Sequence, residues 1–187
     1  MRRLTRSTFA LFVLSAAAPY AVAEDVLVVD AAGGGDFLDL QPAIDAADQR
    51  DTILVRGGDY GGFTVVNKSL NLVADVAVTP HVQGAATVAD LPAGRDVSVS
   101  GLDFDAGLEV RDCVASVLFV ECTFFDPTPG YGEHTHRVVG CEDATFARCA
   151  LLGRAGLSDL WCGDIYDGSD GGHGLLVLDS TLTMYAC

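Results

Sequence analysis

The repeat that organises this chain is clearest in Val97-Ser-Val-Ser-Gly-Leu-Asp-Phe104, which aligns without gaps with Val117-Leu-Phe-Val-Glu-Cys-Thr-Phe124. Two further segments follow the same pattern, Ala144-Thr-Phe-Ala-Arg-Cys-Ala-Leu151 and Leu175-Leu-Val-Leu-Asp-Ser-Thr-Leu182. Positions 1, 3, 6 and 8 are apolar or small in all four. Positions 1 and 3 alternate as one face of a strand does, and a two-residue step then restarts the alternation. This pattern indicates a chain that turns a corner and keeps burying the same side.

The spacing of the repeats predicts the fold class. The four segments start 20, 27 and 31 residues apart, and about 20 residues form one coil of a parallel β-helix. The longer spacings indicate surface insertions at about 125–136 and 163–173, which we expect at different corners of the coil. We therefore predict an all-β protein, a right-handed parallel β-helix. The alternative, an antiparallel β-sandwich, disagrees with the in-line repeat and with the scarcity of Asn-Gly or Asp-Gly hairpin turns.

One segment near the start of the chain is typical of a helix. Apolar residues recur at helical spacing between Leu38 and Ala47, with Asp39 as the expected N-cap and Pro42 in the first turn. We expect this helix to cover the open apolar end of the β-helix. Further strands are predicted at 26–29, 52–55, 63–66 and 70–73.

The first residues predict export. Arg2, Arg3 and Arg6 precede an apolar run, and Ala21-Val22-Ala23 is a small-x-small cleavage site. This order is typical of a secretory signal peptide at 1–23, with the mature domain at 24–187. A membrane anchor is the alternative, but the run is short for a span and ends at Pro19. We expect a secreted protein, extracellular or periplasmic, with no membrane span after cleavage.

The composition excludes some classes of partner. The formal net charge is −15, and removal of 1–23 takes away three arginines and no acid. So acidic a chain repels nucleic acid and anionic lipid. It suits neutral or cationic ligands and divalent cations.

All six cysteines lie in the predicted mature region, and export with an even count favours disulfides over metal ligation. The repeat places Cys122 and Cys149 at one position of successive coils, where the fourth segment has Ser180. Cys113, Cys141 and Cys162 each end the strand before a repeat, so they form a second column, which Cys187 extends. The expected pairs are Cys122–Cys149, Cys113–Cys141 and Cys162–Cys187. The alternative is a column of reduced, buried thiols.

The region from Val26 to Val73 resembles the opening of the pectin-lyase-like superfamily. The similarity lies in Gly35-Asp36-Phe37 before the helix, in Asp51-Thr-Ile-Leu-Val-Arg-Gly-Gly-Asp-Tyr60 and in Val66-Asn-Lys-Ser-Leu-Asn-Leu-Val73. The closest pattern is the start of pectin methylesterases. The resemblance implies the parallel β-helix fold and does not specify an activity.

The catalytic motifs of those esterases are not found. The chain contains no Gln-Asp pair, and Leu152-Gly-Arg154 is followed by Ala-Gly instead of Pro-Trp. The calcium and arginine pattern of pectate lyases has no close match either. No residue is therefore carried over as catalytic.

Three groups of residues are candidate sites. Asp164, Asp167 and Asp170 alternate with glycines and offer oxygen ligands to calcium, the one cofactor that we consider; a solvated loop is the alternative. His134 and His136 form a His-x-His pair that starts a metal site or is merely solvated. Glu121, Arg148 and Asp179 share one repeat position, where they form either an acid–base ladder able to act on a sugar or a surface ion-pair ladder.

These observations favour a non-catalytic secreted module. It either binds polysaccharide, with Tyr131, Trp161 and Tyr166 near the insertions stacking on sugar rings, or serves as a structural or adhesive part of the cell envelope. The alternative is a lyase or esterase acting on polysaccharide. The chain stops soon after an apolar repeat, and an uncovered end recruits other strands. We therefore expect end-to-end self-association, or that the chain is a fragment of a longer β-helix.

Overall fold

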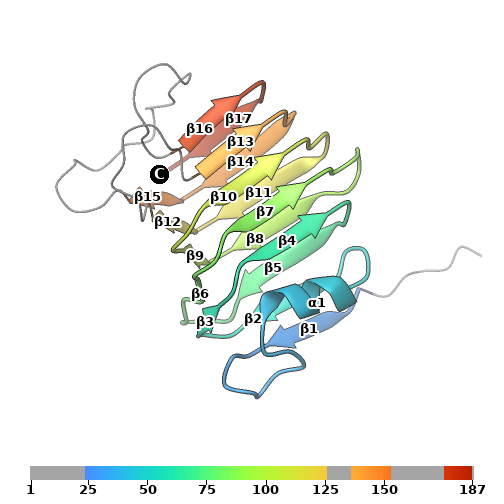
Figure 1. Ribbon diagram of the computed structural model, residues 1–187, viewed down its shortest axis with the longest axis vertical. Coiled ribbons are helices and arrows are strands. Elements are labelled where there is room, and N and C mark those ends of the chain that lie inside the picture. Colours follow the sequence, from blue (N-terminus) through green and yellow to red (C-terminus); the bar gives the residue numbers. More distant parts are fainter. Residues whose placement is uncertain (1–23, 126–135, 153–174, 187) are drawn as a thin grey trace, which may run out of the picture.

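The computed structural model describes residues 24–125, 136–152 and 175–186. The strands form three sheets in which every pairing is parallel (Figure 1). Sheet A contains β1 (Val26–Val29), β2 (Thr52–Val55), β5 (Leu70–Ala74), β8 (Val97–Ser100), β11 (Ser116–Val120), β14 (Asp143–Ala147) and β17 (Leu182–Tyr185). Sheet B contains β3 (Asp59–Tyr60), β6 (His81–Val82), β9 (Asp103–Phe104), β12 (Thr123–Phe125) and β15 (Ala150–Leu152). Sheet C contains β4 (Phe63–Val66), β7 (Ala86–Ala89), β10 (Leu108–Arg111), β13 (His136–Val139) and β16 (Leu175–Leu178).

From β2 onward the chain visits sheets A, B and C in turn and then returns to sheet A one level further along. This is a parallel β solenoid, so the predicted all-β parallel class is confirmed and the antiparallel sandwich is wrong.

Inward side chains of the three sheets make one apolar core. Its centre is aromatic: Phe104 and Phe124 stack between neighbouring strands of sheet B, with ring centroids 5.0 Å apart. Phe119 and Phe146 stack in the same way in sheet A, at 4.9 Å. All four rings are at most 1 % exposed. Burial of four phenylalanines explains how short strands, only two residues long in β9, hold their place in the coil.

Two of the three corners use residues in the left-handed conformation. In the corner from sheet C to sheet A, the residue directly after the strand is left-handed: Asn67, Asp90, Asp112, Gly140 and Asp179 have φ between 47° and 64°. In the corner from sheet A to sheet B, the same holds after β8, β11, β14 and β17, where Gly101, Glu121, Arg148 and Ala186 have φ between 51° and 76°. Most of their backbone N–H groups donate to the next coil, for example from Glu121 to the carbonyl of Ala147 at 2.9 Å. Asn, Asp and Gly tolerate this conformation best, which explains the composition of the first column.

The register of the predicted repeat is correct for three segments and wrong for the fourth. Val97, Val117 and Ala144 pair directly in sheet A. Leu175, however, pairs with His136 in sheet C, and Leu182 is the residue that pairs with Ala144. The fourth segment therefore runs from sheet C into sheet A, whereas the other three run from sheet A into sheet B.

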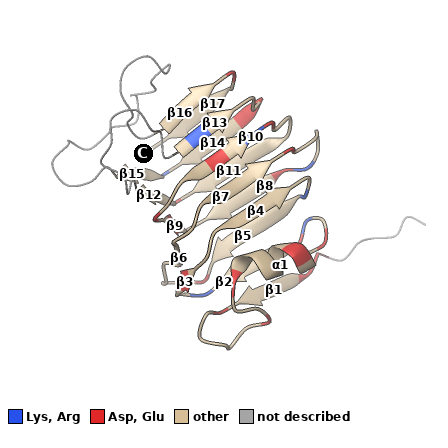
Figure 2. Cartoon of the chain, in the orientation of Figure 1, with Lys and Arg blue, Asp and Glu red and all other residues tan. Residues whose placement is uncertain are grey.

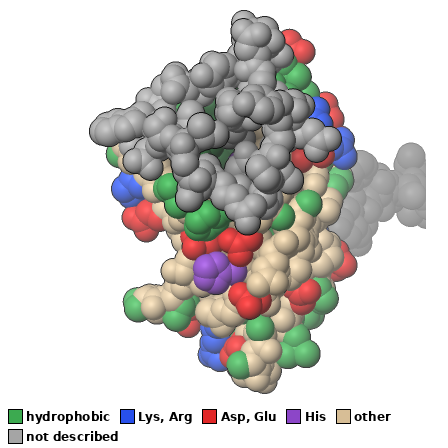
Figure 3. Space-filling view, turned by 60° about the vertical axis from the view of Figure 1, so that its left-hand side comes forward, with side chains coloured by type: hydrophobic (Ala, Val, Ile, Leu, Met, Phe, Trp, Pro, Cys, Tyr) green, Lys and Arg blue, Asp and Glu red, His purple; other side chains and the backbone are tan. Residues whose placement is uncertain are grey.

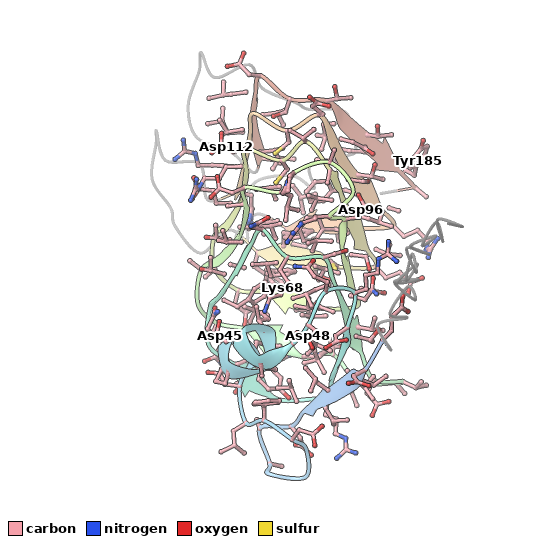
Figure 4. The ribbon with its side chains drawn as sticks, turned by 90° about the vertical axis from the view of Figure 1, so that its right-hand side faces the viewer. Asp45, Asp48, Lys68, Asp96, Asp112 and Tyr185 are labelled. Carbon is pink, nitrogen blue, oxygen red and sulfur yellow. The ribbon has the colours of Figure 1, made fainter. Side chains whose placement is uncertain are left out.

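The helix α1 (Leu40–Ala46) lies at the N-terminal end of the stack, as predicted, with Asp39 as its N-cap. Leu38 precedes the helix and is exposed, so it does not belong to the apolar face. The C-terminal end of α1 is held by Lys68, whose Nζ donates to the carbonyls of Ile44, Asp45 and Ala47 (Figure 4). None of the helices in the described parts of the chain is long and apolar enough to cross a membrane.

The third corner, from sheet B to sheet C, carries both long connections. In the first three coils it is short and rich in glycine: Gly61-Gly62, Gln83-Gly84-Ala85 and Asp105-Ala106-Gly107. Gly62 and Gly84 lie in adjacent coils, where a Cβ on either one would collide with the backbone of the other coil. In the next two coils the corner contains residues 126–135 and 153–174. The prediction that the insertions leave from different corners is therefore wrong, because β12 and β15, which precede them, are neighbours in sheet B.

Candidate functional site

The outward face of sheet B holds a histidine between two carboxylates. The Nδ1 atom of His81 lies 3.8 Å from Oδ2 of Asp103 and 3.7 Å from Oδ2 of Asp105. Figure 3 shows this face, with a histidine among acidic side chains. The Asp103 side chain is 16 % exposed and that of His81 is 43 % exposed, so the imidazole remains accessible from solvent.

The short strands of sheet B create this arrangement. Tyr60, Val82 and Phe104 point inward and are almost fully buried. The residues on either side of them must then point outward, because side chains alternate along a strand. Parallel pairing places Asp59, His81 and Asp103 in one outward column. Asp105 lies in the second outward column, two residues after Asp103.

The second outward column continues past the histidine. Gln83 precedes Asp105 in this column, and Phe125 follows it one strand further along, since Phe124 stacks on Phe104. Phe125 is partly exposed. The carboxylate of Asp105, directly after β9, thus neighbours an aromatic ring at the end of β12, and the long connection of residues 126–135 begins directly after Phe125.

Sheet C differs from sheet B in its charge. Most charged residues of the described chain lie at the corners (Figure 2). On sheet C, the arginine Arg111 lies within 4.0 Å of carboxylates of Asp90, Glu109 and Asp112, so opposite charges meet there. The five strands of sheet B contain two aspartates and a histidine but no lysine or arginine. Asp105, directly after β9, adds a third carboxylate.

This arrangement can bind polar groups and exchange a proton. The carboxylates accept hydrogen bonds from hydroxyl or ammonium groups, and Gln83 both donates and accepts. The imidazole of His81 offers both a hydrogen-bond donor and an acceptor, and its protonated form pairs with both aspartates. In the described parts of the chain, no group of three or more His, Cys, Asp or Glu is arranged to hold a metal ion.

The predicted ladder of Glu121, Arg148 and Asp179 is only partly present. Nε of Arg148 donates to Oε1 of Glu121 at 2.9 Å, and both side chains are more than half exposed. Asp179 lies in the other corner column, with Asp112 and Gly140. Asp179 therefore adds no second carboxylate to the pair of Glu121 and Arg148. An exposed ion pair of this kind contributes about 0–1 kcal/mol to the stability of the fold.

The predicted metal ligands do not form a described site. His136 is 2 % exposed and lies in the core, where its Nδ1 accepts a hydrogen bond from the N–H of Leu108 at 3.2 Å and its ring contacts Phe124. His134, Asp164, Asp167 and Asp170 lie outside the described residues, as do Cys162, Cys187 and the aromatic residues of the insertions.

Four of the six cysteines lie in two pairs, and each pair joins neighbouring coils. Cys113 faces Cys141, and Cys122 faces Cys149, as the hydrogen bonds of their neighbours show. All four are buried free thiols in this structure. Hydrogen bonding within each pair lowers the pKa of Cys141 to about 7 and also lowers that of Cys149, whereas it raises the pKa of Cys113 and Cys122.

Comparison with known proteins gave no match to a family model, to a curated protein or to a solved structure. The site on sheet B is therefore defined by its own geometry.

The sequence pattern did not reveal this site. Asp103 stood in the repeat, but His81 lies in a strand of two residues, which is too short to show alternation. The signal available was that Asp-x-Asp at 103–105 brackets the buried Phe104, so both carboxylates had to point outward.

Proposed function

We propose that this protein is a secreted, right-handed parallel β-helix of the pectin-lyase-like type that binds polysaccharide on the outward face of sheet B. The observation that carries the proposal is the group formed by His81, Asp103 and Asp105 on a sheet whose strands lead into both long connections. Right-handed coils are supported by the general preference of parallel crossovers. The superfamily is supported by the resemblance between residues 26 and 73, and secretion by the predicted signal peptide.

The charge of the face indicates the class of polysaccharide. Carboxylates of Asp59, Asp103 and Asp105 repel uronic acid polymers at neutral pH. Neutral sugars offer hydroxyl groups that these carboxylates accept, and amino sugars add an ammonium group that the carboxylates and the ring of Phe125 attract. We therefore propose a neutral or amino-sugar polysaccharide as the ligand.

The test is retention of the purified protein on insoluble polysaccharides. Cellulose, chitosan and cross-linked polygalacturonate represent neutral, cationic and anionic polymers. We expect depletion of the protein by a neutral or cationic polymer and not by polygalacturonate. Asp103→Asn and His81→Ala should each weaken retention at least about tenfold, which corresponds to about 1.4 kcal/mol.

Asp143→Asn is the matched control, since it removes one exposed carboxylate at the start of β14 in sheet A. Equal retention of the control and the Asp103 variant, or retention by none of the three polymers, would contradict the proposal.

An enzyme acting on polysaccharide is the second candidate. The observation that favours it is the imidazole of His81 within 4 Å of two carboxylates, a combination suited to general acid–base catalysis. Catalysis would release soluble sugar fragments that increase with time, and His81→Ala would abolish their release. Binding without release assigns the non-catalytic function.

A further inference from the structure

The four described cysteines flank two neighbouring strands of sheet A at both ends. Cys113 precedes β11 and Cys122 follows it; Cys141 precedes β14 and Cys149 follows it. β11 and β14 pair along their whole length, from Ser116↔Asp143 to Val120↔Ala147. The thiols of one strand therefore face the thiols of the other strand at both corners.

We propose that two disulfides, Cys113–Cys141 and Cys122–Cys149, join β11 and β14 at both ends into one closed covalent ring. Paired strands lie about 4.8 Å apart, which is within the Cα separation that a disulfide spans. The backbone keeps each pair in register, because Glu142 N–H donates to the carbonyl of Cys113 at 2.8 Å and Ala150 N–H donates to that of Cys122 at 2.9 Å.

The ring has a structural purpose at this level of the solenoid. Cys122 and Cys149 directly precede β12 and β15, from which the two long connections leave. Long connections weaken the coupling between coils, because more chain entropy is lost when their ends are brought together. A covalent link at the starts of β12 and β15 keeps the two strands side by side whatever the connections do.

The chemistry needs an external disulfide, such as oxidised glutathione or an oxidised dithiol oxidoreductase. The thiolate of Cys149 attacks one sulfur of that disulfide, which forms a mixed disulfide and releases one thiolate. The sulfur of Cys122, having lost its proton, then attacks Cys149 and releases the second. Two electrons pass from the cysteine pair to the oxidant, which leaves as two thiols. Cys141 and Cys113 react in the same way, and the lowered pKa of Cys141 and of Cys149 favours these two as the attacking groups.

Burial sets the time at which the ring closes. The four cysteines are at most 2 % exposed in the folded chain, so an oxidant reaches them before the two coils have packed together. The ring should thus form during folding in an oxidising compartment or in a glutathione redox buffer.

The experiment is peptide mapping of the full chain, exported or refolded with glutathione, after cleavage at arginine and glutamate without reduction. The ring predicts two cross-linked products: residues 112–121 joined to 138–142, and residues 122–133 joined to 149–154. Reduction should separate both products and lower the melting temperature of the wild type. A variant with all six cysteines changed to serine should melt at a temperature that the reductant does not alter.

Three results would overturn the proposal. The first is free thiols at all four positions in oxidised material. The second is a link between 112–121 and 122–133, which would join the two ends of β11 itself. The third is a cross-link from any of the four to Cys162 or Cys187 in place of the two expected products. Cys162→Ser serves as the control, because the expected products should be unchanged in it. Polysaccharide binding does not enter this test.

Discussion

The hydroxyl of Ser180 accepts a hydrogen bond from the backbone N–H of Cys141, with 2.9 Å between Oγ and nitrogen. Ser180 therefore continues the column of Cys113 and Cys141, and not the column of Cys122 and Cys149 to which the sequence pattern assigned it. The Thr181 N–H adds a hydrogen bond to the carbonyl of Cys141 at 2.9 Å. This contact joins the corner before β17 to the coil below it.

Ser180→Ala should destabilise the last described coil. The substitution removes the acceptor of the Cys141 N–H and the donor to the carbonyl of Leu178, and we expect a loss of about 1 kcal/mol in the free energy of unfolding. Urea denaturation measures this loss. Ser116→Ala is the control, because the backbone N–H of Ser116, and not its side chain, donates to Asp96. Equal effects of the two changes would show that the Ser180 hydroxyl makes no specific contribution.

Phe124 and Phe125 should respond oppositely to truncation. Phe124→Ala empties a site in the aromatic core beside Phe104 and Phe146 and should cost about 3–5 kcal/mol of stability. Phe125→Ala removes an outward ring from the same strand, so it should leave stability nearly unchanged and weaken polysaccharide retention. Thermal unfolding and the retention assay measure the two effects. A large loss of stability in Phe125→Ala would mean that its ring is part of the core.

Lys68→Met should loosen the helix α1. The substitution keeps the apolar stem but removes the hydrogen bonds to three carbonyls at the end of the helix. Because hydrogen bonds from a charged group are strong, we expect the free energy of unfolding to fall by about 1.5–3 kcal/mol. Hydrogen exchange should become faster in 40–47 before it does so in β11. Arg137→Met, an exposed position on β13, controls for the loss of positive charge in an acidic protein; a similar loss of stability there would assign the effect to net charge.

The stability gained from Asp30 should depend on pH in a defined direction. Hydrogen bonds from the N–H of Ala32 and from Arg56 lower the pKa of the Asp30 carboxyl below its ordinary value of 3.8. A lowered folded-state pKa stabilises the fold above the unfolded-state pKa and loses this effect as pH falls through the folded value. Asp30→Asn should therefore be less stable than the wild type at pH 7, and the difference should shrink below pH of about 4. Chemical denaturation from pH 7 to 3 measures it; a difference independent of pH would contradict the mechanism.

Gly140→Ala should strain the corner between sheets C and A. Gly140 has φ of 64°, and a Cβ there would lie 3.3 Å from Oδ1 of Asp112. The left-handed conformation costs a residue with a side chain about 1–2 kcal/mol, so we expect a loss of about that size. The reverse change in the other corner column, Glu121→Gly, should relieve strain and lose only the exposed pair with Arg148. A higher stability of Gly140→Ala than of the wild type in urea denaturation would contradict this account.

The alternation of apolar residues was sufficient to predict much of the fold. Val97-x-Val99 and Val117-x-Phe119 have the alternation of half-buried strands, and their recurrence in line at coil length favours parallel stacking. Asp39 before an amphipathic segment likewise specified the start of α1. These features are local, because each depends on the period of a single strand or helix and on burial of one side.

Tertiary structure alone determined which corner each repeat belongs to. Both corners with left-handed residues have the same local pattern: two inward residues, a left-handed residue such as Glu121 or Asp179, and a small residue such as Cys122 or Ser180. The local sequence therefore does not distinguish between the turn that leads from sheet A into sheet B and the turn that leads from sheet C into sheet A. Only pairing with the neighbouring coil places Leu182 on Ala144. The same holds for His81, since a strand of two residues has no period of its own and acquires its direction, and its two carboxylate neighbours, from the coils stacked around it.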